Sequence, residues 1–393
     1  MHIPRVVLTG GPCGGKTTAL NVISEWLRNN GFTVMVAPEA ATILLNAGFK
    51  YRDDIDSSYL QERIMRLQLF FEEELLESFL CSQPFPCRPI YLGDRGVGDI
   101  EAYCSNKREF YGICEKYLGT SDITEIRDKR YDAVIHMVTA ADGAEECYTL
   151  KNNPARKERT LEEAVAKDRA TQNAWVGHED LMIIDNVHSK DFDHKIRRVW
   201  AAVCRKLEMP TPTQEEERFL VYAPSFLSGD CARHETSCWS LQYGTSSVIP
   251  VSIEQAYIMS GAIGERRIRR REQEGESIYY ETHKREIAGH KKRAETERQI
   301  TEEEYYTKLY AERDNDFEVI AKIRYCFIWK NQYFKLDVFI FPHEGLSILE
   351  IETTEEQPEV EVPPFLKIIK NITGDRRYAN RELSRKGTML PKI

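Results

Sequence analysis

The sequence has no run of 18 or more apolar residues, so no segment is long enough to cross a membrane as a helix. Closely spaced cysteine pairs are also missing. The ten cysteines are scattered, which excludes a zinc-ribbon type of site and is typical of reduced thiols in the cytosol. The first expected strand follows Met-His-Ile-Pro directly and leaves no room for a signal peptide. We therefore expect a cytoplasmic protein.

An excess of positive charge is absent as well, because the net charge is −9. This balance excludes nucleic-acid binding over the whole surface, and we expect no nucleic-acid partner. Hydrophobic residues make up 41% and charged residues 30% of the chain, as in ordinary globular proteins. The length of 393 residues allows two domains.

One glycine-rich motif near the start has the pattern of a phosphate-binding loop, Gly-x4-Gly-Lys-Ser/Thr. Its residues are Gly10, Gly11, Pro12, Cys13, Gly14, Gly15, Lys16 and Thr17, followed by Thr18. A short apolar run, 5–9, precedes it, and apolar residues at helical spacing follow over 18–27. This strand–loop–helix context predicts backbone N–H groups around a phosphate, with Lys16 on the β- and γ-phosphates and Thr17 on Mg²⁺.

Carboxylates follow two further expected strands. Asp94 ends the apolar strand 89–94, an arrangement typical of the second Mg²⁺ ligand beside Thr17. Arg95 comes next and is a candidate for phosphate or substrate binding, with a salt bridge as the alternative. Glu39 follows the strand 32–36, where it would hold a metal-bound water or an acceptor group, or simply begin a helix.

Two other candidate groups lie later in this half. Arg156 and Arg159 precede an expected helix, 161–175, and either clamp a transferred phosphate or form a solvated basic loop. Asp185 and Asn186 end the expected strand 181–184, where a base or ribose would bind. The guanine signature Asn-Lys-x-Asp is absent, so these motifs do not distinguish GTP from ATP.

Strands and helices alternate over 1–207, which predicts a parallel sheet covered by helices. With its phosphate loop, Asp94 and Arg95, this part resembles the AAA-type ATPase/GTPase family related to small-molecule kinases. The resemblance implies a nucleotide-binding domain at 1–207 in which Asp94, Arg95, Glu39, Arg156 and Arg159 are catalytic.

The hydrophobic periodicity changes from helical spacing to alternation after a short stiff linker, 208–214. Period-2 strands predict an antiparallel sheet or closed barrel over 215–393. The expected strands cover 218–222, 237–243, 257–259, 266–271, 277–284, 318–329, 332–341 and 347–352.

Charges of like sign alternate along several of these strands. Arg267, Arg269 and Arg271 share one face of a strand, and Lys322 and Arg324 share a face of another. Glu350 and Glu352 do the same with negative charge. If these faces converge, they predict a site for a polyanion, with the two glutamates binding a divalent metal.

The second half resembles the CYTH, or triphosphate tunnel, family. The matching residues are Gln255, Ala256, Tyr257, Arg269, Arg271, Thr282, Lys284, Lys322, Arg324, Asp337, Glu350, Glu352 and the segment 372–380. That family opens with Glu-x-Glu-x-Lys, whereas this chain has Gln214, Glu216 and Arg218. The resemblance implies polyanion binding by Arg218, Arg269, Arg271, Lys284, Lys322 and Arg324, and the lost first acid weakens the case for triphosphate hydrolysis.

A phosphate-loop domain joined to a CYTH-like domain resembles the TRPL-translocation-defect family of animal proteins. That resemblance implies binding of GTP or GDP with Mg²⁺, binding of a phosphoinositide or other anionic headgroup, and a role in ion-channel trafficking with peripheral membrane association. The competing hypothesis is an enzyme, either a small-molecule kinase of nucleoside or nucleotide type or an inorganic triphosphatase.

Overall fold

The computed structural model of the chain describes residues 2–49, 57–148, 158, 160–207, 209, 215–222, 245–260, 264–286, 293–354 and 360–390. The chain divides into two compact units, 1–213 and 214–393. None of the helices within the described ranges is both long and apolar enough to cross a bilayer.

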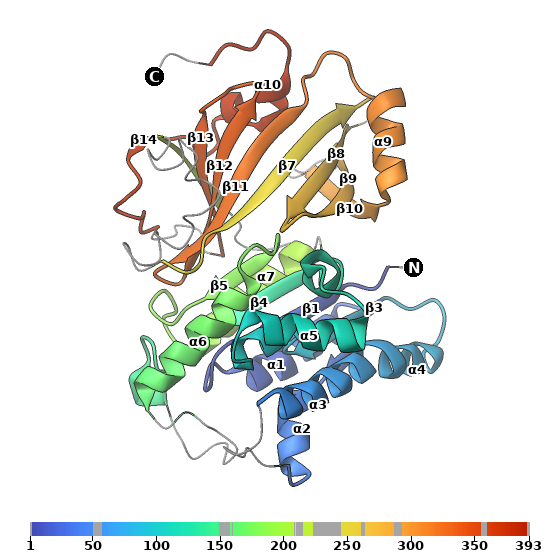
Figure 1. Ribbon diagram of the computed structural model, residues 1–393, viewed down its shortest axis with the longest axis vertical. Helices are drawn as coiled ribbons and strands as arrows, with labels where there is room; N and C mark the ends of the chain where they lie inside the picture. The colour runs from blue at the N-terminus through green and yellow to red at the C-terminus, as the bar shows by residue number, and fades with distance from the viewer. Residues whose placement is uncertain are drawn as a thin grey trace. The chain divides into compact units, whose positions relative to one another are not determined.

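The first unit is built on a five-stranded parallel sheet with the order β2-β3-β1-β4-β5 (Figure 1). The strands are β1 (Arg5–Thr9), β2 (Thr33–Ala37), β3 (Pro89–Asp94), β4 (Ala133–Met137) and β5 (Leu181–Ile184). Most of their residues are buried, as their apolar sequences require of a sheet with both faces covered. The predicted parallel sheet is therefore confirmed.

Helices connect and cover these strands. Their bounds are α1 (Lys16–Asn29), α2 (Ala40–Asn46), α3 (Ser57–Phe70), α4 (Leu76–Cys81), α5 (Lys107–Leu118), α6 (Leu161–Trp175) and α7 (Phe192–Lys206), and a 3₁₀ helix, η2 (Val97–Tyr103), follows β3. Leu20, Ile23 and Leu27 of α1 pack with Ile196 and Val199 of α7 in one core against the sheet.

One expected helix is interrupted. The helical pattern from 58 to 80 predicts a single helix, but a π-helical stretch, η1 (Phe71–Leu75), separates α3 from α4. The wider turn inserts an extra residue and changes which side chains face inward. Phe71 and Glu72 are buried there as a result.

The second unit is a nine-stranded antiparallel sheet with the order β10-β9-β8-β7-β11-β12-β13-β6-β14. The predicted antiparallel architecture is confirmed. The strands are β6 (Glu215–Val221), β7 (Ile249–Ile258), β8 (Glu265–Gln273), β9 (Glu276–Glu286), β10 (Arg293–Ile300), β11 (Ile320–Trp329), β12 (Gln332–Phe341), β13 (Ser347–Thr353) and β14 (Ile368–Asn371).

Several elements differ from the sequence-based expectation, among them strand β14, which was not expected. Strand β10 and helix α9 (Glu302–Ala311) have polar sequences, and hydrophobic periodicity therefore missed both. Strand β7 begins at Ile249, well before the expected 257. The expected strand at 237–243 lies outside the described residues.

The two faces of this sheet are covered differently. Aromatic and aliphatic side chains fill one face: Tyr279 and Ile268 pack with Tyr305 of α9, and Phe327 packs with Phe334 farther along. On the other face, Ile320 and Phe339 pack with Tyr378 and Leu383 of the C-terminal segment. That apolar cluster occupies only one end of this face and leaves the rest to charged side chains.

Candidate functional site

The topology of the first sheet places the candidate site residues together. The connection after β1 runs to one side of the sheet and the connection after its neighbour β3 runs to the other, and ligands bind at the carboxyl ends of strands at such a switch point. The phosphate loop follows β1, Glu39 follows β2, and Arg95 follows β3.

The loop has the conformation its glycines allow. Gly10 and Gly15 have φ of 141° and 88°, in a region that disfavours side chains, and Cys13 also has a positive φ of 56°. Helix α1 begins at Lys16, so the loop amides lie at a helix N-terminus, which favours anions. The Lys16 ammonium donates to the carbonyl oxygens of Gly10 (3.1 Å) and Gly11 (2.9 Å).

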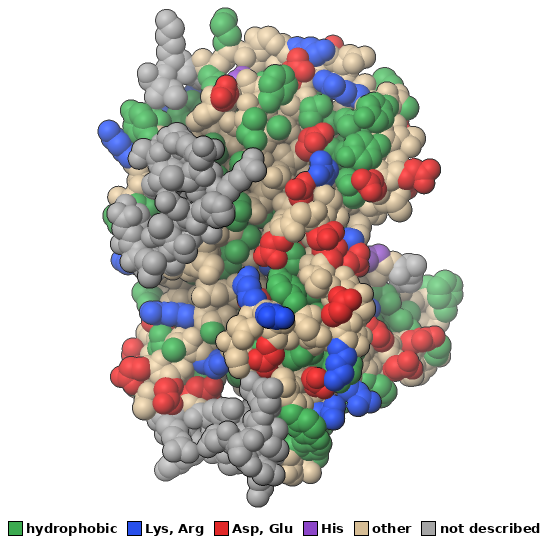
Figure 2. Space-filling model, viewed as in Figure 1, with side chains coloured by type: hydrophobic (Ala, Val, Ile, Leu, Met, Phe, Trp, Pro, Cys, Tyr) green, Lys and Arg blue, Asp and Glu red, His purple; other side chains and the backbone are tan. Residues whose placement is uncertain are grey.

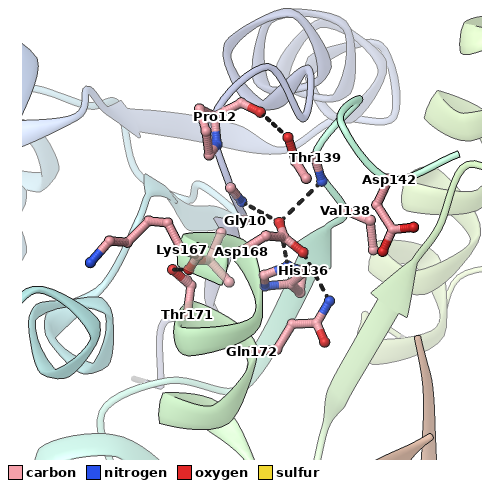
Figure 3. Close-up of polar contacts among 12 residues, drawn as sticks. Gly10, Pro12, His136, Val138, Thr139, Asp142, Lys167, Asp168, Thr171 and Gln172 are labelled. Carbon is pink, nitrogen blue, oxygen red and sulfur yellow. Dashed lines mark hydrogen bonds and ion pairs between the residues drawn. The ribbon is translucent and has the colours of Figure 1, made fainter. Parts of the chain in front are cut away.

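The carboxylate of Asp168 on α6 hydrogen-bonds the backbone of the phosphate loop (Figure 3). Its Oδ1 accepts hydrogen bonds from the backbone N–H of Gly11 at 2.6 Å and of Thr139 at 3.0 Å, and contacts His136 Nε2 at 3.1 Å. A Cβ on Gly11 would fall 2.5 Å from that oxygen. Asp168 is therefore a structural partner of the loop that the sequence motif does not reveal, because it lies more than 150 residues away.

The residues predicted to hold Mg²⁺ are adjacent. Thr17 Oγ1 donates to Asp94 Oδ2 at 3.1 Å. Asp94 is buried, and its Oδ1 has no hydrogen-bond partner among the residues that the structure describes. Burial raises the pKa of Asp94, and the nearby Glu39 carboxylate adds to that rise. An oxygen donor set with one orphaned carboxylate oxygen fits a hard divalent cation.

Glu39 and Arg95 form an ion pair across the crevice, with Arg95 Nε 2.6 Å from Glu39 Oε1. Thr42 Oγ1 donates to the other oxygen of Glu39 at 2.5 Å. Burial opposes the charge on Glu39, but Arg95 and Lys16 outweigh it and lower the pKa of Glu39 to about 2. Glu39 is therefore ionised at neutral pH.

Arg95 is held in a strained backbone conformation, with φ of 74° for a residue that has a side chain. Such a conformation costs roughly 1–2 kcal/mol and persists where the surroundings enforce it. Arg95 Nη1 lies 3.5 Å from Asp99 Oδ1. Within the described part of the chain, Nη1 makes no hydrogen bond although it is buried.

A cavity of about 600 Å³ joins these groups. It extends from the loop to helices α2 and α3, so it is larger than the predicted phosphate site. Its lining includes Cys13, Gly14, Gly15, Lys16, Thr17, Thr18, Glu39, Thr42, Asn46, Gln61, Ile64, Gln68, Arg95, Asp99, Ile100 and Tyr103. Sequence reasoning missed Gln61, Gln68 and Tyr103, because no motif surrounds them.

Other predicted site residues lie elsewhere. Asp185 accepts from Arg198 Nη1 at 3.0 Å, and Asn186 accepts from Lys195 Nζ at 2.6 Å. Neither side chain lines the cavity, so their prediction as base or ribose contacts has no geometric support at this cavity. Arg156 and Arg159 lie outside the described residues.

The second unit gathers its predicted charges on one face of the sheet. Residues directly opposite on paired strands share a face. The pairs Arg218–Glu350, Glu350–Lys335 and Asp337–Arg324 link β6, β13, β12 and β11 in this way. The pairs Ile320–Gln255, Gln255–Arg269, Arg267–Thr282 and Thr282–Glu297 continue the same face from β11 to β10.

We call this surface the charged face, defined by Arg218, Gln255, Arg267, Arg269, Arg271, Thr282, Lys284, Glu297, Lys322, Arg324, Lys335, Asp337, Glu350 and Glu352. Many of its members are buried, Asp337 completely and Arg271 and Lys322 nearly so. Solvation alone does not explain buried cations, since a charge taken out of water needs a partner.

Ion pairs connect the members. Asp337 accepts from Arg324 Nε at 2.7 Å and also binds Lys322. Burial opposes the charge on Asp337, but these two cations hold its pKa well below the usual range. Glu350 accepts from Arg218 Nη2 at 2.9 Å and from Arg324 Nη2 at 3.0 Å.

The predicted metal ligands on this face bind cations of the protein. Both oxygens of Glu350 face arginines, and Glu352 Oε1 is 2.7 Å from Lys335 Nζ. Among the described residues, no group of three or more His, Cys, Asp or Glu side chains is arranged to hold a metal ion. Metal binding by Glu350 and Glu352 therefore stays a prediction.

On the face of the molecule shown in Figure 2, Lys and Arg side chains are interspersed with Asp and Glu.

Comparisons with known proteins found partial matches to this chain. Residues 5–193 match the AAA_28 family, described as an AAA domain. The inorganic triphosphatase of Acetivibrio thermocellus is 37% identical over 65 residues, which are 16% of this chain and 40% of that protein. The chain thus spans less than half the length of this curated relative.

Two solved structures were also compared. The inorganic triphosphatase NE1496 is 24% identical, with a TM-score of 0.30, over 44% of this chain and 94% of that one. The PH1819 protein of Pyrococcus horikoshii is 18% identical, with a TM-score of 0.26, over 37% of this chain and 81% of that one. The chain is therefore similar to AAA domains over residues 5–193 and, over a shorter stretch, to an inorganic triphosphatase.

Proposed function

We propose that the first unit binds a nucleoside triphosphate and transfers its γ-phosphoryl group to a hydroxyl of a small molecule. The observation that carries this proposal is the single cavity that continues from the phosphate loop past Glu39 and Arg95 to α3. A protein that only bound and slowly hydrolysed a nucleotide would need space for its phosphates, ribose and base, but no acceptor space beside Glu39 and Arg95. Cavities of this size are typical of small-ligand sites.

The loop amides and Lys16 bind the β- and γ-phosphates. Thr17 and Asp94 would hold Mg²⁺, which supplies charge neutralisation on the phosphate oxygens. Arg95 Nη1, which makes no hydrogen bond among the described residues, would contact the transferring group. These residues stabilise charge and fix position, which is most of what phosphoryl transfer requires of a protein.

Glu39 orients the acceptor. Its ionised carboxylate accepts a hydrogen bond from the acceptor hydroxyl while Arg95 and Thr42 hold it in place. The acceptor oxygen bonds to the γ-phosphorus, and the bond to the β–γ bridging oxygen breaks. The nucleoside diphosphate leaves, and the hydroxyl proton passes through Glu39 to water. A weak base suffices because the hydroxyl acidifies as the new bond forms.

A transfer assay tests the proposal. The full chain is incubated with Mg²⁺ and ATP or GTP labelled at the γ-phosphate, against a panel of hydroxyl-bearing metabolites. We expect label on at least one acceptor and loss of about 100-fold in rate for Glu39→Gln. Glu62→Gln is the matched control, because Glu62 pairs with Lys116 outside the cavity. Tight nucleotide binding without transfer to any acceptor contradicts the proposal.

For the second unit we propose binding of a linear triphosphate on the charged face. Two observations support this proposal: the buried cations on that face, and the partial match of the chain to an inorganic triphosphatase. The family resemblance implies a different ligand, a phosphoinositide, together with a role in trafficking. Inositol trisphosphate is included in the experiment below to test this alternative. Calorimetry with inorganic triphosphate, inositol trisphosphate, ATP and GTP, each with and without Mg²⁺, separates these ligands. Equal, weak binding of all of them would remove the proposal.

A further inference from the structure

Helix α3 presents two carboxamides to the cavity. Gln61, Ile64 and Gln68 all line it, and their spacing of three and four residues places them on one face of the helix. The rise of an α-helix puts Gln61 and Gln68 about 10 Å apart along its axis. The wall of the cavity opposite the phosphate loop therefore has a polar group, an apolar stretch and a second polar group.

Gln61 lines the cavity, and its side chain is 4% exposed. No hydrogen bond joins its amide to another residue within the described ranges, yet its nitrogen and oxygen are not among the fully buried unpaired polar atoms of those residues. The amide therefore opens onto the cavity, where a ligand can donate to its oxygen and accept from its nitrogen.

Gln68 is held in one orientation. Its Nε2 donates to Glu72 Oε1 at 2.8 Å and to the backbone carbonyl of Arg95 at 3.3 Å. Both partners can only accept, so the amide nitrogen must face them. The Gln68 oxygen is the end left for the cavity, and it requires a ligand that donates an N–H or O–H.

Glu72 fixes Gln68. It lies in the π-helical stretch η1 and is fully buried. Its oxygens also accept from Tyr131 Oη at 2.7 Å and Arg130 Nη1 at 2.8 Å. Glu72 does not line the cavity, so it is a positioning residue.

We propose that the phosphoryl acceptor is a nucleoside, an inference that rests on the proposed function. A nucleoside has hydroxyls at one end for Glu39 and a flat ring with apolar faces for Ile64 and Ile100. The edge of its base carries N–H donors and acceptors that match the Gln68 oxygen and the Gln61 amide. Carboxamides read base edges in this way elsewhere.

Equilibrium dialysis tests the site directly. Labelled adenosine, guanosine, cytidine and uridine are dialysed against the full chain with Mg²⁺ and a non-hydrolysable ATP or GTP analogue. We expect at least one nucleoside to bind, with affinity reduced about tenfold by Gln61→Met and by Gln68→Met. The affinity for the analogue should not change. Gln83→Met is the matched control, because Gln83 bonds Phe79 at the end of α4.

The role of Glu72 has its own readout. In Glu72→Gln the partner of Gln68 becomes an amide, so the Gln68 side chain is no longer held in one orientation. We expect a change in the preference among the four nucleosides, which a merely destabilising change would not cause. An unchanged order of preference removes the positioning role.

The outcomes separate this inference from the proposed function. If phosphoryl transfer occurs to a different acceptor and no nucleoside binds, the inference is wrong and the function stands. If a nucleoside binds with the expected dependence on Gln61 but no acceptor is phosphorylated, the binding site stands and the kinase proposal fails. Nucleoside binding that Gln61→Met leaves unchanged overturns the inference.

Discussion

The phosphate loop of the first unit and the charged face of the second both present anion-binding groups, but they use different parts of the chain. The loop relies on backbone amides at a helix N-terminus and one lysine. The charged face relies on guanidinium and ammonium groups from strands that are far apart in sequence. The loop needs eight consecutive residues, whereas the face exists only when the sheet has assembled.

The difference lies in what each arrangement costs. Backbone amides carry no net charge, so a loop that presents several of them needs no counter-charge before the ligand arrives. Buried cations must be paired, and Asp337 and Glu350 supply that pairing. We infer that the carboxylates of the charged face hold the cations in place in the absence of an anion. Four predictions test this contrast.

Removing Asp337 should have the largest effect. Asp337→Asn leaves Lys322 and Arg324 buried beside a neutral group, and breaking such a pair costs about 3–5 kcal/mol. Urea unfolding should show this loss in the second unit. In Asp375→Asn, the matched control at a surface ion pair with Arg377, stability should change little. Equal stability of the two variants would mean that the charged face is not held by its ion pairs.

Lys16→Ala should act on binding and leave folding intact. Among the residues that the structure describes, the ammonium hydrogen-bonds the loop carbonyls of Gly10 and Gly11, and it lies where the phosphates would bind. We expect ATP or GTP affinity to fall about 10- to 100-fold, as for the loss of charged hydrogen bonds. Triphosphate binding by the second unit should be unchanged. Lys107→Ala serves as the surface control. A parallel loss of triphosphate binding would show that the two sites are not separate.

Mild acid should lower the free energy of unfolding of the first unit more than that of the second. Burial lowers the pKa of His178 to about 4, and its ring bonds the backbone at Tyr131 and Asp180. The unfolded chain binds this proton near pH 6.5, so stability present above that pH falls as the pH drops toward 4. The loss at pH 5 is about 2 kcal/mol.

The charged face should resist the same change, because the low pKa of Asp337 keeps its carboxylate ionised at pH 5. Urea unfolding at pH 7.5 and pH 5, with wild type and His178→Gln, measures both effects. The variant should lose less stability between the two pH values than the wild type. A larger loss in the second unit would reverse the comparison.

Glu350→Gln should have the smallest effect of the four changes, and whether triphosphate affinity rises or falls is informative. Without the carboxylate, Arg218 and Arg324 each lose one ion-pair partner, which an incoming anion can replace. We expect triphosphate affinity without metal to rise severalfold, by about 1 kcal/mol, as for one ion pair. Calorimetry with and without Mg²⁺ distinguishes this role from metal binding. A drop in affinity seen only with Mg²⁺ would instead support the predicted metal site.

Much of the first unit could be predicted because its signals are local. The motif at 10–17 and the strand ending at Asp94 each contain their own context, and both predicted Mg²⁺ ligands came together. The cavity wall on α3 could not be predicted, because Gln61 and Gln68 look like the glutamines of a helix face that is exposed to solvent. The hydrogen bonds of Asp168 to the phosphate loop could not be predicted for another reason. Its partners are backbone N–H groups, which every residue type except proline carries, so the sequence does not mark them.

In the second unit, alternation alone placed Lys322 with Arg324 and Arg269 with Arg271, since the strand period of two follows from backbone geometry. It did not show that Glu350 binds two arginines, because partners depend on register between strands. The sequence by itself determined the fold class, the phosphate loop and which charges share a strand face, since these depend on neighbours along the chain. Only the tertiary structure decided which carboxylate neutralises which cation and where the cavity ends, because those contacts join residues that meet only after the sheets and helices have packed.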